Sequence, residues 1–179
     1  AKRSDDTVLI EATSNQVNQD RGYTGMMPQD FTNFVYQIAD KQHFPREKII
    51  LGGDHMGPLP WVDLPEAEAM DRAEVLVRAC VQAGYQKIHL DTSMRLGDDP
   101  LDQPLEDATI AARGARLYRA CEEEFEKLSQ RNPDAVHPVY VIGSEVPIPG
   151  GSQEEEDTVQ VTTPERFEKT LLAYHQKFL

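Results

Sequence analysis

The chain has 179 residues, of which 39% are hydrophobic and 27% charged, and its formal net charge is −13. This composition is typical of a soluble globular protein with one good-sized core. The acidic excess argues against binding to nucleic acid or to an anionic membrane surface, because both kinds of binding draw on cationic side chains. No apolar run approaches the roughly 20 residues of a membrane-spanning helix. We therefore expect neither nucleic acid nor membrane among the partners.

The first residues and the cysteines point to a reducing compartment. Residues 1–7 are polar and charged and do not resemble a signal peptide. Cys80 and Cys121 both fall inside helical patterns, where small buried hydrophobes are expected, and nothing indicates a disulfide framework. We expect a cytoplasmic location.

Apolar runs typical of strands alternate with helical patterns along the chain. The predicted strands, in chain order, cover residues 7–12, 48–51, 87–91 and 139–142. The helices that follow them cover residues 28–41, 65–83 and 105–130, and a last helix begins at Pro164 after the cap Thr163. The last helix has the apolar stripe Phe167, Leu171, Tyr174 and Phe178. Four such units predict an α/β fold with a parallel sheet built from right-handed crossovers.

Two architectures fit this alternation, an open doubly wound sheet and part of a closed barrel. A doubly wound sheet places its chemistry at one switch point, whereas a barrel collects it from the ends of many strands. Every predicted strand here ends in polar residues, which favours a (β/α)8 TIM-type barrel. A full barrel takes roughly 250 residues. We therefore expect residues 1–179 to form a single partial barrel domain, about half of the whole, and a half-barrel that dimerises is the less favoured alternative.

Polar residues with catalytic or ligand chemistry recur at the predicted strand ends. They are four carboxylates and two imidazoles: Glu11, Asp54, Asp91, Glu145, His55 and His89. Side chains alternate along a strand, so His89 and Asp91 share one face, opposite Ile88 and Leu90. Two polar residues on one face at a strand's end indicate a site. The alternative is a polar layer that only fills the barrel interior.

The pair Asp54-His55 is the sharpest of these features. The preceding Gly52 and Gly53 allow the backbone to bend and approach a ligand closely. A neutral imidazole of His55 can bind a divalent metal such as Zn²⁺, Glu145 can add an oxygen ligand, and Asp54 can act as a base or orient the ligand. The alternative is a histidine that caps a helix or binds a carbonyl. Because P-loop, GxGxxG, GxSxG and CxxC patterns do not occur, we expect no nucleotide cofactor.

Several longer stretches carry a resemblance to a known family. They are IEATSNQVNQ (10–19), GYTGM (22–26), LGGDHMGP (51–58), KIHLDTSM (87–94), IGSEVPIPGG (142–151) and VTTP (161–164). Together they resemble the Z-type subunit of class II tagatose-1,6-bisphosphate aldolase, the GatZ/KbaZ family. The resemblance implies a (β/α)8 barrel with further β/α units before Ala1 and after Leu179.

The resemblance also implies a function and a partner. It points to the cytoplasmic breakdown of galactitol or N-acetylgalactosamine, with a zinc-dependent Y-type subunit that cleaves tagatose 1,6-bisphosphate to dihydroxyacetone phosphate and glyceraldehyde 3-phosphate. Z-type subunits are regarded as non-catalytic supports of that subunit's stability and activity. A homo-oligomer is a further expectation, because strand edges left open by a partial barrel associate.

A supporting subunit would not need this collection of polar residues, so a second interpretation stays open. Some relatives of the family are ketohexose or ketohexose-phosphate 4-epimerases, which would use a metal and retro-aldol chemistry on a sugar or sugar phosphate. For such a site we assign catalytic roles to Asp54 and Asp91, and substrate contacts to Glu11, Asn15 and His89. Metal contacts go to His55 and Glu145. With two good ligands in this chain we expect it to hold metal weakly or not at all. A third interpretation is a fragment without function of its own.

Overall fold

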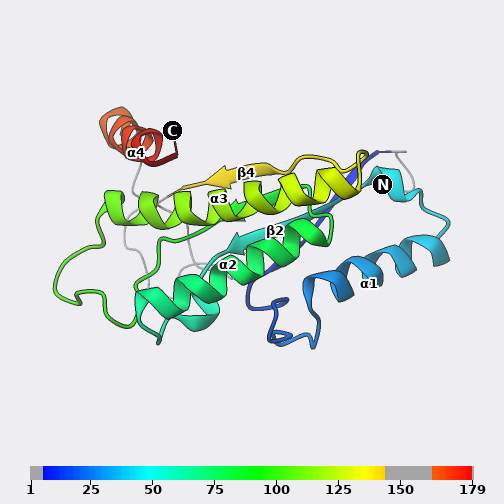
Figure 1. The fold of residues 1–179 in the computed structure, drawn as a ribbon, viewed down its shortest axis with the longest axis horizontal. Coiled ribbons are helices and arrows are strands. Elements are labelled where there is room, and N and C mark those ends of the chain that lie inside the picture. The colour runs from blue at the N-terminus through cyan, green and yellow to red at the C-terminus, as the bar shows by residue number, and fades with distance from the viewer. Residues whose placement is uncertain (1–5, 144–162, 179) are drawn as a thin grey trace.

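The computed structural model describes residues 6–143 and 163–178, which alternate between strands and helices (Figure 1). The strands are β1 (Val8–Thr13), β2 (Ile49–Met56), β3 (Lys87–Leu90) and β4 (Val139–Ile142). The α-helices are α1 (Pro28–Lys41), α2 (Glu66–Gln82), α3 (Asp107–Arg131) and α4 (Pro164–Phe178). Two short 3-10 helices, η1 (Arg46–Lys48) and η2 (Leu59–Trp61), lie on either side of β2.

The sheet is parallel, and its strands lie in sequential order β1-β2-β3-β4. Helices α1, α2 and α3 all lie on one face of it, and α4 packs on α3 near the carboxyl end of β4 (Figure 1). A doubly wound sheet reverses its strand order and carries helices on both faces. The described part of the chain is therefore a singly wound α/β array, and it does not fit the alternative of a doubly wound sheet.

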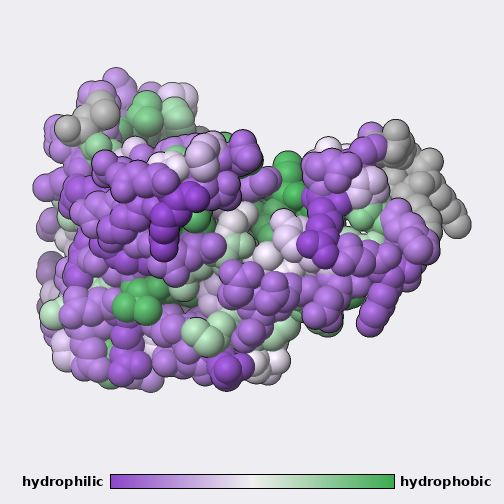
Figure 2. Space-filling view, turned by 45° about the vertical axis from the view of Figure 1, so that its right-hand side comes forward, coloured by the Kyte–Doolittle hydropathy of each residue, from purple (hydrophilic) through white to green (hydrophobic). Residues whose placement is uncertain are grey.

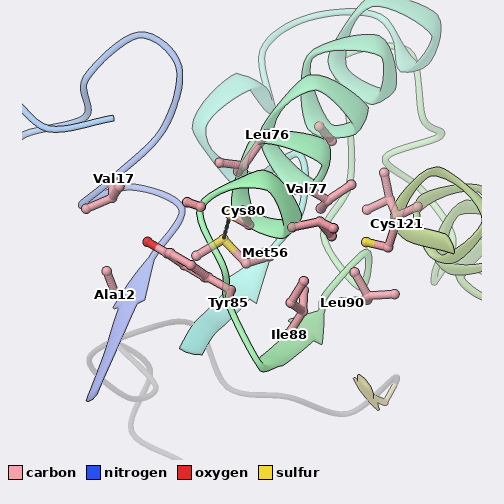
Figure 3. Close-up of a cluster of buried hydrophobic side chains, with 14 of the residues drawn as sticks. Ala12, Val17, Met56, Leu76, Val77, Cys80, Tyr85, Ile88, Leu90 and Cys121 are labelled. Carbon is pink, nitrogen blue, oxygen red and sulfur yellow. Dashed lines mark hydrogen bonds between the residues drawn. The ribbon is translucent and has the colours of Figure 1, made fainter. Parts of the chain in front are cut away.

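The core lies between the sheet and these three helices. Ile88 and Leu90 of β3 are fully buried there against Leu76 and Val77 of α2 (Figure 3). Met56 adds a soft side chain beside Cys80, whose Sγ lies 4.0 Å from the Met56 Sδ. Both cysteines, Cys80 and Cys121, are free and buried, as the sequence predicts, and burial raises the pKa of their thiols. The opposite face of the sheet carries the polar residues and the half-exposed Leu9, since none of the described helices covers it.

Two predicted features differ from the structure. The second strand does not end before the glycines but runs through Gly52 to Met56, because β1 on one side and β3 on the other both pair with this stretch. In α4 only Tyr174 of the predicted stripe is buried, while Phe167 and Leu171 are exposed. The predicted burial is confirmed at the end of α4 that meets α3. It is wrong for the first two turns, where no described element covers the apolar side chains. The predicted cap holds, since the Arg166 N–H donates to Thr163 Oγ1 at 3.3 Å.

The face of the molecule seen in Figure 2 is mostly hydrophilic, and its hydrophobic groups are divided into separate patches. An apolar groove lies between β1 and α1, and it is lined by Val8, Ile10, Phe34, Ile38 and Phe44 among others. None of the polar strand-end residues lines this groove. None of the described helices is long and apolar enough to cross a membrane.

Candidate metal centre

Four predicted site residues meet at the carboxyl ends of β2 and β3. Asp54 and His55 come from the end of β2, His89 lies within β3, and Asp91 directly follows it. The side chains of His55, His89 and Asp91 are at least nine-tenths buried, and that of Asp54 is 37% exposed. Parallel neighbours end at the same edge of a sheet, so the register of β2 with β3 brings the two pairs together.

A β-bulge lets Asp54 and His55 reach the same face of the sheet. Gly53 pairs with Ile88 and Met56 pairs with Leu90, so β2 has one residue more than β3 between these two pairs. His55 takes up the extra residue with a φ of 49°, a left-handed conformation that costs a histidine roughly 1–2 kcal/mol. In a regular strand these consecutive side chains would point to opposite faces. Here Asp54 contacts His89 and His55 contacts Asp91.

His55 is held by a buried carboxylate. Its Nδ1 lies 2.6 Å from Asp91 Oδ2, and we assign the N–H to this nitrogen because a carboxylate oxygen accepts the hydrogen bond. The other oxygen of Asp91 accepts hydrogen bonds from Ser93, at 3.0 Å from the backbone N and 2.6 Å from Oγ. With both oxygens bonded and the side chain 3% exposed, Asp91 orients His55 and is poorly placed to reach a substrate.

His89 is held in a similar way by Asp54. The His89 Nδ1 lies 2.9 Å from Asp54 Oδ1 and 3.4 Å from the backbone N of His55. Burial disfavours the charged form of Asp54, but hydrogen bonds from His89 and Lys87 outweigh it, so the pKa of this carboxyl is lowered. The shorter contact is therefore with an ionised carboxylate, which assigns the proton to His89 Nδ1.

This assignment leaves the Nε2 lone pair of both imidazoles available for a ligand. A metal-bound histidine commonly donates its other N–H to a carboxylate, as both rings do here. One ligand atom each from Asp54, His55 and His89 lies within 4.8 Å of the others. Ligand atoms around a tetrahedral Zn²⁺ lie about 3.4 Å apart, and His55 Nε2 and Asp54 Oδ2, at 3.8 Å, are already close to that spacing.

The charge of the cluster also fits a divalent cation. The cluster holds the carboxylates of Glu11, Asp54 and Asp91 and the ammonium of Lys87, which pairs with the first two, so its formal net charge is −2 with both imidazoles neutral. Three protein ligands and an open position are what a catalytic divalent-metal site usually has. The residues present therefore fit a divalent ion, and Asp54, His55 and His89 would hold it.

The remaining predicted residues lie around this centre or outside the described residues. Glu11 lies in the middle of β1, and its Oε1 is 2.6 Å from the Lys87 Nζ. Asn15 lies in the turn after β1, where its carbonyl accepts the Tyr23 N–H at 3.0 Å. Glu145 lies outside the described residues. Substrate contacts for Glu11 and Asn15 and a metal contact for Glu145 stay predictions.

Sequence reasoning missed two contributors. Lys87 lies two residues before His89 and four before Asp91. Side chains at this spacing point to the same face of a strand, so the sequence did contain a signal that Lys87 shares their face. Ser93 lies two residues after Asp91, beyond the end of the strand, and its hydroxyl donates a hydrogen bond to Asp91. His89 lies with Asp54 and His55 as a third candidate ligand, and its predicted contact with substrate stays a prediction.

A buried arginine of α3 anchors the loop that follows Asp91. Arg113 of α3 is 3% exposed, and its guanidinium binds both oxygens of Asp99 at 2.9 Å and 2.7 Å. A third bond of 2.6 Å reaches Glu66 at the start of α2. The hydrogen bonds from Arg113 hold the pKa of Asp99 below its usual value in spite of burial. The segment that carries Asp91 and Ser93 is thereby tied to two helices.

Fold and site together define a singly wound parallel α/β protein with a candidate divalent-metal centre at the carboxyl ends of its strands. The chain belongs to the family of D-tagatose-1,6-bisphosphate aldolase subunit GatZ/KbaZ-like proteins, whose model matches residues 1–179. Membership of this family places the chain in carbohydrate metabolism.

A solved structure supports the same relationship. The crystal structure of a probable tagatose 6-phosphate kinase from Sinorhizobium meliloti 1021 is 49% identical in sequence and superimposes with a TM-score of 0.80. The match covers 99% of this chain and 39% of that chain. The chain thus spans well under half the length of the structure it resembles.

Proposed function

We propose that this chain is part of a cytoplasmic Z-type subunit that supports a catalytic Y-type subunit of class II tagatose-1,6-bisphosphate aldolase. The observation that carries the proposal is the match of the family model over residues 1–179. The singly wound sheet is consistent with a sector of a (β/α)8 barrel, in which the remaining strands would complete the mouth around Asp54, His55 and His89.

The partner role is tested by mixing the full-length protein with a purified Y-type subunit. We expect the cleavage rate of tagatose 1,6-bisphosphate or the thermal midpoint of the Y-type subunit to rise until the two proteins are equimolar. Bovine serum albumin at the same concentration controls for non-specific protection. An unchanged rate and midpoint at saturating amounts would exclude the supporting role.

A second candidate function follows from the metal-type cluster, which a purely supporting subunit does not require. We propose that the intact protein binds a divalent ion through Asp54, His55 and His89 and epimerises a ketohexose or its phosphate at C4. When bound, the ion would act as a Lewis acid toward the oxygens of the sugar. The side chains of this chain hold and orient the ligands: Asp91 fixes His55, and Lys87 steadies Asp54.

The reaction itself is an aldol cleavage and its reversal. A proton leaves the C4 hydroxyl, the C3–C4 bond breaks, and its electron pair stays with the ketone half. The aldehyde half turns, and re-addition of C3 to its opposite face restores the bond and the proton with C4 inverted. Substrate and product have the same composition, so no oxidant or reductant is consumed.

Metal content and isomer analysis test this second function. After dialysis we expect the full-length protein to hold about one divalent ion per chain, and we expect the His55→Ala variant to hold much less. Incubation with fructose or tagatose, free and as the phosphate, should give the C4 epimer by chromatography. Equal metal in both proteins would remove His55 from the ligand set, and absent metal with absent turnover would leave the supporting role alone.

A further inference from the structure

Three residues in register on adjacent strands form a row across the sheet, on the amino-terminal side of the proposed metal ligands. Glu11 on β1 pairs in register with Gly52 on β2, and Gly52 pairs with Lys87 on β3. Glu11 and Lys87 thus lie two strands apart, yet Glu11 Oε1 and Lys87 Nζ are separated by 2.6 Å. This ion pair spans the whole width of β2, and the two side chains are 27% and 20% exposed.

The absence of a side chain at Gly52 is what allows this contact. A Cβ placed on Gly52 would lie 2.8 Å from Glu11 Oε1 and 2.9 Å from Glu11 Cγ. Real Cβ atoms do not approach other heavy atoms that closely, so any other residue here would force the Glu11 side chain out of the position in which it meets Lys87. The close approach of Glu11 explains the glycine in the interior of β2.

Lys87 also contacts Asp54, one of the three proposed metal ligands. Its Nζ lies 3.2 Å from Asp54 Oδ1, the same oxygen that accepts from His89 Nδ1 at 2.9 Å. Two donors on Oδ1 fix the plane of the carboxylate. The second oxygen, Oδ2, is then turned toward His55 and lies 3.8 Å from its Nε2.

We propose that Lys87, steered by Glu11 across Gly52, is a positioning residue that presents Asp54 Oδ2 to the divalent ion. The inference rests on the metal centre proposed above. An ammonium group close to a cation site is unfavourable by charge alone. Its presence is explained when the charge is balanced by Glu11 and the hydrogen bond to Asp54 orders a ligand.

The charge effect and the positioning effect have opposite signs, which makes the inference testable. Lys87→Met removes a positive charge, so electrostatics alone predicts tighter binding of a cation. The double variant Glu11→Gln/Lys87→Met removes one charge of each sign, so electrostatics alone predicts unchanged binding. Loss of positioning predicts weaker binding in both variants. The double variant also avoids an unpaired Glu11, which could unfold the single variant.

The measurement is a Co²⁺ titration of the intact metal-free protein, followed by calorimetry and by the visible absorption of the bound ion. We expect the Kd for Co²⁺ to rise about tenfold or more in both variants, as for other groups that orient metal ligands. We also expect a changed Co²⁺ spectrum at saturation, because Asp54 is no longer held in the ligand shell. A merely structural role would lower the thermal midpoint and leave that spectrum unchanged.

The control is Lys41→Met, which makes the same charge change at an exposed position of α1. Tighter or unchanged Co²⁺ binding by the Lys87 variants, with the spectrum of the unsubstituted protein, would overturn the role of Lys87 and leave the metal centre intact. No Co²⁺ binding by the unsubstituted protein would overturn the metal centre and this role with it.

Discussion

The imidazole of His55 donates its Nδ1–H to Asp91 Oδ2 across 2.6 Å, and Asp91 is itself held by Ser93 through its other oxygen. This relationship fixes both the orientation of the ring and the nitrogen that is left for a ligand. The hydrogen bond joins His55, in the bulge of β2, to Asp91, directly after β3, so that the two side chains form one hydrogen-bonded unit.

Replacing the carboxylate of this unit should weaken metal binding without removing a ligand. In Asp91→Asn the amide no longer fixes the proton on His55 Nδ1, so we expect the Kd for Zn²⁺ or Co²⁺ to rise by about 10- to 100-fold. Calorimetry on the metal-free protein measures it. Asp134→Asn, an exposed change in the loop at the other end of the sheet, is the matched control. An unchanged Kd would show that His55 does not depend on Asp91.

The left-handed conformation of His55 predicts different stabilities for two variants that both lose the imidazole. His55→Gly can adopt a φ of 49° without strain, whereas His55→Ala cannot. We expect the glycine variant to have the higher free energy of unfolding, by about 1 kcal/mol, in urea denaturation without metal. Because glycine lowers stability at ordinary positions, an alanine variant that is the more stable of the two would argue against the bulge geometry.

Gly57 should tolerate no side chain, because the backbone after β3 lies against it. A Cβ on Gly57 would lie 1.8 Å from the carbonyl oxygen of Asp91, and neither backbone can yield without moving the site. We expect Gly57→Ala to cost about 3 kcal/mol or more of unfolding free energy and to weaken metal binding. Gly84→Ala serves for comparison, since that site is open and only its φ of +83° opposes alanine. Equal losses in the two variants would contradict the close packing of Gly57 on Asp91.

The buried Arg113–Asp99 pair predicts a pH dependence of stability. The pKa of Asp99 is lowered in the folded protein, so its contribution is fully present above the unfolded value of about 3.9. The contribution is lost as the pH falls through the lower, folded value. We expect Asp99→Asn to cost about 2–3 kcal/mol at pH 7 and progressively less below about pH 4. Urea denaturation from pH 7 to pH 3 measures the difference, and a constant gap over that range would contradict it.

The sequence by itself determined the fold class and most of the elements. The predicted bounds of α1 and β4 match the structure, and the other elements differ mainly at their ends. These elements follow from periodicity, since apolar residues spaced for a helix or a strand can be buried in only one local conformation. The alternation of His89 and Asp91 with Ile88 and Leu90 was predicted correctly for the same reason.

Tertiary structure decided the site. The bulge at Asp54 and His55 exists because β2 pairs on both sides with different registers, and nothing local to the sequence shows a register. Lys87 became part of the site through its contacts with two other strands, Asp54 at the end of β2 and Glu11 on β1, which reaches it over Gly52. Local patterns report which face a side chain is on. Which residues meet on that face depends on strand pairing between distant segments, and that information is held by the packed chain as a whole.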